Sequence, residues 1–207
     1  RYLQAVLAGR RDEAEQVVLE FVDSGAPVQD AYSFILTPAQ IEVGRMWHRG
    51  RITVAEEHLA TRATEGAMGA LRRRFPRAPA NSRTVLTTTV GGDLHGVGIQ
   101  MIADFFEMDG WRSIHLGANM PIGDLRQALT EHRVDLLAIS ASSALNVRSV
   151  GEAIDQVRRS PTERVKVIVG GYPFNVAPEL WRELGADGSA SSASEAVALG
   201  NRLLTQR

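Results

Sequence analysis

One loop of the sequence places a histidine among glycines, with a carboxylate two residues before it. Asp93-Leu94-His95 follows Gly91-Gly92 and precedes Gly96-Val97-Gly98. A neutral imidazole can give one ring nitrogen to a metal while an aspartate accepts a hydrogen bond from the other, which fixes the tautomer and raises the basicity of the ligand. Glycines let the backbone approach a bulky ligand closely. The loop therefore fits either a metal ligand or a polar histidine that is bonded locally.

What this loop lacks excludes several other kinds of site. It does not end in the Lys and Ser/Thr of a phosphate-binding P-loop, and residues 96–101 lack the last glycine of the dinucleotide fingerprint. The chain has no Cys, and no second His or paired carboxylate lies nearby in the sequence to complete a zinc shell. A metal bound by His95 would have to bring its other ligands with it.

Strand and helix patterns alternate through the half of the chain that contains this loop. Thr84–Val90 is a β-branched run directly before the loop, and the further strands that we expect are 113–116, 134–140, 165–169 and 187–190. Helical patterns separate them, which predicts a parallel sheet covered on both faces. Ligands of such sheets bind outside the carboxyl ends of the strands. The His95 loop is expected at that position.

The first part of the chain has helical periodicity instead. Apolar residues recur at three- and four-residue steps in four segments, which are separated by turns at 25–27 and 49–51. Thr53-Val54-Ala55-Glu56 predicts a capping box at the start of the fourth helix. We therefore predict an α/β chain in which a four-helix bundle, residues 1–78, precedes a doubly wound, Rossmann-like sheet of five parallel strands, residues 83–207. The proline-containing segment 76–83 is the expected linker.

The composition restricts the classes of partner. The formal net charge of -1 argues against nucleic-acid binding by this chain, because phosphate neutralisation needs many Lys and Arg on one face. No apolar stretch approaches the roughly 20 residues that span a bilayer, so no membrane contact is expected. The absence of Cys fits a reducing cytoplasm.

The loop and three later elements resemble a known family. Asp93-x-His95-x-x-Gly98 resembles the D-x-H-x-x-G motif of cobalamin-binding domains of the methionine synthase type. Ser140 resembles the serine of the family's S-x-L element, with Ser142 in place of the usual Leu. Gly170-Gly171 resembles its diglycine, and residues 115–121 resemble its L-G-x-x-x-P turn. The resemblance covers residues 83–207.

This resemblance implies that cobalamin binds with its own base displaced and its nucleotide tail in a cleft at the end of the sheet. His95 is then the lower cobalt ligand, and Asp93 orients it. The other residues that the resemblance places against cobalamin are Gly96, Val97, Gly98, Leu116, Ser140, Ser142, Gly170, Gly171 and Tyr172.

The helical part carries a second resemblance. Trp47, followed after nine residues by Glu57-His58, resembles the W-x9-EH signature of adenosylcobalamin photosensors of the CarH/LitR type. This implies that the bundle caps the upper face of cobalamin. Trp47, Glu57 and His58 would then enclose the adenosyl group, and His48 or His58 would bind cobalt after light. Taken singly, these residues also fit a core tryptophan, a charge on a helix face and an interhelical histidine.

The main hypothesis is thus a light-sensing module that binds adenosylcobalamin and signals as a homo-oligomer or through a fused output domain. The alternative is a corrinoid methyl carrier for methyltransferases, which keeps His95 but gives Trp47-His48 and Glu57-His58 no role. A further alternative is a cobalamin sensor that also holds a bilin such as biliverdin, bound non-covalently because Cys is absent. We find no general-base pair or nucleophile constellation, so we expect no catalysis by the chain alone.

Overall fold

The computed structural model describes residues 1–76, 78–159 and 165–205. The chain divides into two compact units, Arg1–Pro76 and Arg77–Arg207. Of the predicted linker, residue 77 lies outside the described residues, as do residues 160–164 and 206–207 of the predicted sheet domain. No helix among the described residues is both long enough and apolar enough to cross a membrane.

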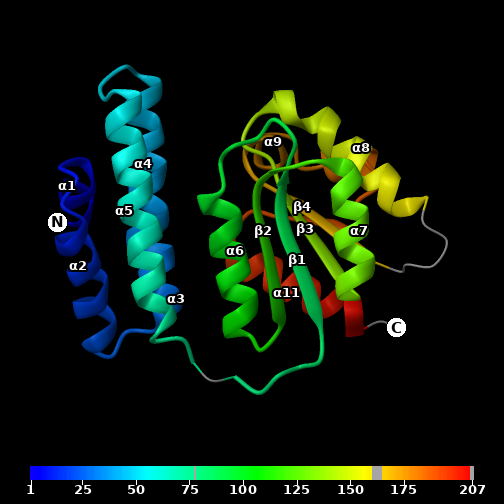
Figure 1. Cartoon of the computed structure of the whole chain (residues 1–207), viewed down its shortest axis with the longest axis horizontal. Helices are drawn as coiled ribbons and strands as arrows, with labels where there is room; N and C mark the ends of the chain where they lie inside the picture. Colours follow the sequence, from blue (N-terminus) through cyan, green and yellow to red (C-terminus); the bar gives the residue numbers. More distant parts are fainter. Residues whose placement is uncertain (77, 160–164, 206–207) are drawn as a thin grey trace. The chain divides into compact units, whose positions relative to one another are not determined.

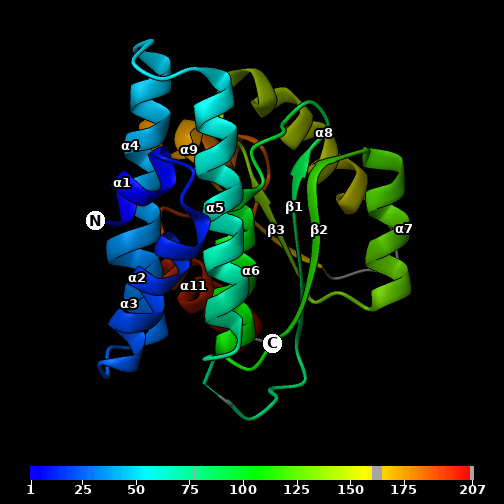
Figure 2. The same ribbon diagram turned by 60° about the vertical axis from the view of Figure 1, so that its left-hand side comes forward.

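The first unit is the predicted bundle of four helices (Figure 2). Its elements are α1 (Tyr2–Leu7), α2 (Arg11–Asp23), a continuous helical segment made of α3 (Val28–Ala31), η1 (Tyr32–Leu36) and α4 (Thr37–His48), and α5 (Val54–Arg72). The apolar stripes seen in the sequence are buried between the helices, where Val6, Val18, Leu36, Val43 and Met68 are fully inaccessible to solvent. Burial of such stripes accounts for most of the stability of helices of this length.

The capping box predicted at the start of α5 is confirmed. Glu56 donates its backbone N–H to Thr53 Oγ1 at 3.2 Å, and Glu56 Oε2 accepts the backbone N–H of Thr53 at 2.7 Å. The sequence did not indicate that the third helix contains a π-helical turn, η1. Pro38 follows this turn and has no N–H to offer the carbonyl of Phe34, so a locally widened turn avoids the clash that a regular α-helix would impose.

The second unit is an α/β domain, also as predicted (Figure 1). Its strands are β1 (Thr84–Val90), β2 (Arg112–Met120), β3 (Leu136–Ser140), β4 (Lys166–Gly170) and β5 (Gly188–Ala190). They form one sheet in the order β2-β1-β3-β4-β5, and every pair is parallel. The chain leaves β1 towards β2 and returns to β3 on the other side. The gap between the loops after β1 and β3 is therefore the topological switch point, where such sheets bind ligands.

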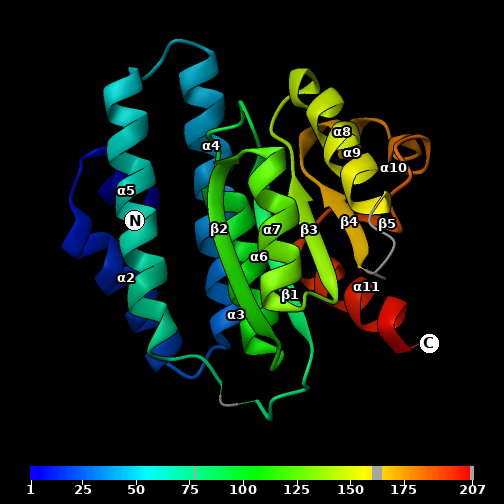
Figure 3. The same cartoon turned by 45° about the vertical axis from the view of Figure 1, so that its right-hand side comes forward.

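Helices cover both faces of this sheet (Figures 1 and 3). On one face α6 (Val97–Met108) and α11 (Ala193–Thr205) bury a core around Phe106, and on the other α7 (Ile122–His132) and α8 (Val147–Arg158) bury a core around Ile154. Short helices complete the loops that follow β3 and β4, namely η2 (Ala144–Asn146), α9 (Tyr172–Val176) and α10 (Leu180–Glu183).

Strand β2 is longer than the predicted segment 113–116. It continues to Met120, and its pairing with β1 is irregular in two places: Thr87 and Thr88 lie opposite His115 and Gly117, and Val90 lies opposite Met120. Two residues of β2, Ala118 and Asn119, therefore face the single residue Thr89. Such a β-bulge bends a strand and redirects its side chains. Residues 115–121, which resemble a turn in the sequence, therefore form the end of this strand up to Met120.

Candidate functional site

The His95 side chain is oriented by Asp93 in the loop that connects β1 to α6. His95 Nδ1 lies 3.0 Å from Asp93 Oδ1, and the backbone N–H of His95 donates to the same oxygen at 3.1 Å. The Asp93 side chain is fully buried, whereas 68% of the His95 side chain is exposed. With Nδ1 turned towards the carboxylate, Nε2 is the ring nitrogen through which a metal would be bound.

A residue from the loop after β3 completes this arrangement. Ser142 donates its backbone N–H to Asp93 Oδ2 at 2.7 Å and its hydroxyl to Oδ1 at 2.9 Å. Burial alone raises the pKa of the Asp93 carboxyl, but the hydrogen bonds from the His95 ring, from Ser142 and from the His95 backbone together lower that pKa below its ordinary value. The carboxylate therefore stays ionised and keeps the proton on His95 Nδ1.

Two kinds of glycine occur among the predicted site residues. A Cβ on Gly171, whose φ is +98°, would lie 2.1 Å from the backbone oxygen of Ala141, and one on Gly170 would lie 2.8 Å from that of Ala190. These two glycines allow close packing of backbone against backbone. In contrast, a Cβ on Gly98, in the first turn of α6, would meet no atom within 4 Å. Among the glycines predicted at the site, all of which the structure describes, Gly98 alone faces open space.

Not all of the other residues predicted for this site lie at the His95 loop. Ser140 ends β3 and pairs in the sheet with Thr89 and Gly170. Gly96 and Val97 lead into α6 and are half-buried. The side chain of Leu116 packs against the core on the α7 and α8 face instead of towards the loop. Exposed apolar side chains lie in the segments that follow β1, β3 and β4, namely Leu94, Leu145, Tyr172 and Val176. Of these four, Tyr172 is the one that was predicted from the sequence.

In the bundle, the predicted residues gather at the end where α4 is joined to α5 (Figure 2). Trp47, in the last turn of α4, is 44% exposed, and the adjacent His48 is also exposed. Glu57 Oε1 accepts a hydrogen bond from Thr61 Oγ1 at 2.8 Å, and its other oxygen lies 3.6 Å from His58 Nε2. These contacts lie within α5 itself, as expected of residues on the surface of a helix.

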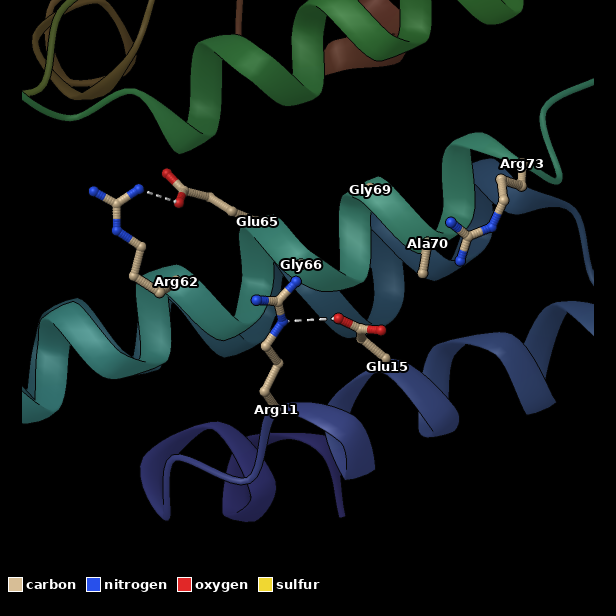
Figure 4. A pocket seen from close by; sticks show the side chains of 8 residues that line it. All are labelled: Arg11, Glu15, Arg62, Glu65, Gly66, Gly69, Ala70 and Arg73. Atoms are coloured by element: carbon tan, nitrogen blue, oxygen red, sulfur yellow. Dashed lines mark hydrogen bonds and ion pairs between the residues drawn. The ribbon is translucent and has the colours of Figure 1, made fainter.

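The bundle also contains a hollow of about 490 Å³ along α2 and α5 (Figure 4), which includes none of the predicted site residues. Four of its charged lining residues form two ion pairs, Arg11 with Glu15 at 2.9 Å and Arg62 with Glu65 at 2.8 Å. A Cβ on Gly66 would lie 2.6 Å from Arg11 Nε, so this glycine lets the Arg11 side chain lie across α5. The hollow therefore does not coincide with the predicted cobalamin site.

Comparisons with known proteins agree with the cobalamin-binding motif of the second unit. Residues 83–198 match the family model of the B12 binding domain, and residues 1–72 match a second B12 binding domain model. Dimethylamine corrinoid protein 1 of Methanosarcina acetivorans is 29% identical over 79% of this chain and 77% of its own length. A corrinoid protein of Desulfitobacterium hafniense is 25% identical over 97% of this chain and 94% of its own length.

Solved structures show the same fold. The monomethylamine corrinoid protein of Methanosarcina barkeri superposes with a TM-score of 0.85 at 20% identity, covering 98% of this chain and 96% of that one. A chain of the methanol:cobalamin methyltransferase complex of the same species gives a TM-score of 0.57 at 16% identity, covering 100% of this chain and 79% of that one.

The light-sensing interpretation is wrong. The relatives are corrinoid proteins and not photoreceptors of the CarH/LitR type. The W-x9-EH spacing spans the end of α4, a turn and the start of α5. Two packed helices produce this spacing without an adenosyl group between them, so the spacing alone did not identify a photosensor. The inferences of an adenosyl group, a bilin and a cobalt ligand exchange at His48 or His58 depended on that interpretation, and the relatives and structures named above do not support them.

The two kinds of glycine predict opposite effects of substitution by alanine. Gly171→Ala should destabilise the fold by at least about 1–3 kcal/mol, since it adds backbone strain to a steric overlap. Gly98→Ala should leave the stability of the apo-protein unchanged or raise it by up to about 1 kcal/mol, because alanine favours a helix, yet it should weaken cobalamin binding. Thermal unfolding and cobalamin titration of both variants check this. Unimpaired binding by Gly98→Ala would show that no ligand occupies the space beside it.

The lowered pKa of Asp93 predicts how the stability of the apo-protein depends on pH. Because the folded-state pKa lies below the ordinary value of 3.8, the ionised carboxylate stabilises the fold above that pH, and this contribution is lost as the pH falls through the folded-state pKa. Asp93→Asn should cost roughly 1–3 kcal/mol at neutral pH and progressively less in acid. Urea unfolding of both proteins from about pH 7 to pH 3 measures the difference. A difference that grows on acidification would contradict the assignment.

Proposed function

Because the chain belongs to the B12 binding domain family, we propose that it is a corrinoid methyl carrier, which binds cobalamin through His95 and exchanges methyl groups with partner methyltransferases. The alternative function stated from the sequence thus replaces the light sensor. The observation that carries the proposal is the arrangement of Asp93 and His95, in which a buried carboxylate fixes one nitrogen of an otherwise exposed imidazole. The names of the relatives support the choice of methyl transfer.

The residues of the second unit fit a corrinoid. His95 provides one nitrogen ligand, which suits a metal that is already held in a ring. The open space beside Gly98 leaves room for a large ligand at the start of α6. Leu94, Leu145 and Tyr172 offer apolar surface in the loops around this position. Burial of these side chains against the corrinoid would contribute to affinity.

The chemistry is shared between the cofactor and the protein. When bound, the corrinoid supplies a cobalt ion that takes up and releases the methyl group. Ser142 and the backbone of His95 keep the Asp93 carboxylate ionised, so that Asp93 holds the Nδ1–H tautomer of His95 and raises the basicity of Nε2. We propose that the partner methyltransferases, and not this chain, provide the acid–base or nucleophilic catalysis that the methyl donor requires.

The role of the bundle as a cap on the upper face of cobalamin stays a prediction. Trp47 offers the largest exposed aromatic surface at the end of the bundle where α4 and α5 are joined. If it covers the corrinoid, Trp47→Ala should weaken cobalamin binding, whereas Arg62→Ala, in the middle of α5, should not.

Methyl transfer tests the proposed function directly. The reduced holoprotein would be mixed in turn with methyltransferases for monomethylamine, dimethylamine and methanol, each with its methyl donor, and methylation of cobalt would be followed by visible spectroscopy. Methyl iodide, which needs no enzyme, serves as the control for a competent cofactor. We expect at least one enzyme to methylate the wild-type protein, and His95→Ala to bind cobalamin 10–100-fold more weakly. Methylation by methyl iodide but by none of the enzymes would contradict the carrier function.

A further inference from the structure

The loop that carries His95 is fixed at a second place, away from Ser142. The hydroxyl of Thr89, in β1, donates to the backbone oxygen of Asp93 at 2.6 Å and accepts the backbone N–H of Asn119 at 2.9 Å. The N–H of Asn119 also points to the Asp93 oxygen, at 3.0 Å. Thr89 is fully buried. A buried hydroxyl that both donates and accepts in this way strongly restricts the position of the groups that it joins.

Asn119 contacts the same loop through its side chain as well. Its Oδ1 accepts the backbone N–H of Gly92 at 2.7 Å. Asn119 has a φ of +60°, a left-handed conformation that asparagine adopts more readily than most residues. This conformation occurs at the β-bulge of β2, where Ala118 and Asn119 together face Thr89. The bulge thus turns the end of an edge strand towards the ligand loop, a placement often found beside functional sites.

We propose that Thr89 and Asn119 are positioning residues, which clamp the backbone of Asp93 so that its carboxylate presents the His95 ring to cobalt. Ser142 holds only the carboxylate, and with that contact alone the loop could pivot about the side chain of Asp93. The Thr89–Asn119 clamp fixes the backbone carbonyl of Asp93 and the N–H of Gly92, and so removes that freedom. The inference rests on the proposed ligation of cobalt by His95.

The neighbouring residue in β1 provides a matched control. Thr88 is also fully buried, but its hydroxyl bonds to the backbone oxygens of Gly117 and Thr89, each at 3.0 Å, and not to the ligand loop. Thr88→Val and Thr89→Val therefore remove the same hydroxyl group from the same strand. Only the second removes a contact with Asp93.

Titration with cobalamin tests the clamp, with the visible spectrum reporting the lower cobalt ligand and His95→Ala defining the spectrum without that histidine. We expect Thr89→Val to weaken cobalamin binding about tenfold and to shift the spectrum part of the way towards that of His95→Ala. Thr89→Ser should restore both properties, and Thr88→Val should match the wild type. Asn119→Gly, which keeps the positive φ but loses the bond to Gly92, should shift the spectrum in the same direction as Thr89→Val.

Several outcomes would overturn the clamp. If Thr89→Val and Asn119→Gly both keep the wild-type spectrum and affinity while His95→Ala loses them, His95 is the ligand but the clamp is wrong. An equal shift in Thr88→Val would assign the effect to packing of β1. If His95→Ala itself keeps the wild-type spectrum, the ligation by His95 fails and the clamp fails with it. Thermal unfolding of each apo-protein identifies any variant that does not fold. Because Thr89 is in β1 and Asn119 is in β2, the test can still be made with one variant if the other does not fold.

Discussion

The hydrogen bonding of the buried Asp93 carboxylate is the constraint on which the rest of the site depends. A carboxylate without exposed surface is costly unless charge-assisted hydrogen bonds replace its water. Here the donors are His95 and Ser142, so the bonds that offset the burial of the charge are also the bonds that orient the imidazole. A single group thereby stabilises the loop and sets the tautomer of His95, the proposed cobalt ligand.

The topology of the sheet explains how these groups meet. Asp93 and Ser142 follow β1 and β3, which are neighbours in the sheet although the β2–α7 excursion separates them in the chain. The strand order reverses at this point, because β1 connects through α6 on one face of the sheet and β3 connects through α8 on the other, and such sheets bind ligands at this position. On the other side of β1, the bulge in β2 brings Asn119 against the same loop. The ligand loop is thus held from both neighbouring strands.

Local patterns were sufficient to predict the helices, the alternating strands and the residues of the His95 loop, because periodicity and a short motif define them. The bonds from Ser142 and Thr89 to Asp93 were not predictable in this way. The Ser142 contact needs the strand order, since 49 residues separate the partners. The Asn119 contact needs a bulge, which has no clear sequence signal beyond the positive φ that asparagine tolerates. Trp47 with Glu57-His58 shows the opposite error, in which a short spacing between two helix ends resembled the signature of a photosensor.

The most direct test of the central claim is electron paramagnetic resonance of the protein loaded with cobalt(II) cobalamin. The spectrum reports the nitrogen that is bound axially to cobalt, and the protein would be prepared with ¹⁵N-labelled histidine while the cofactor keeps ¹⁴N. We predict that the nitrogen splitting changes from triplets in the unlabelled protein to doublets in the labelled protein, and that His95→Ala abolishes the doublets. Triplets in the labelled wild-type protein would show that the cofactor's own base stays on cobalt, which would contradict the role assigned to Asp93 and His95.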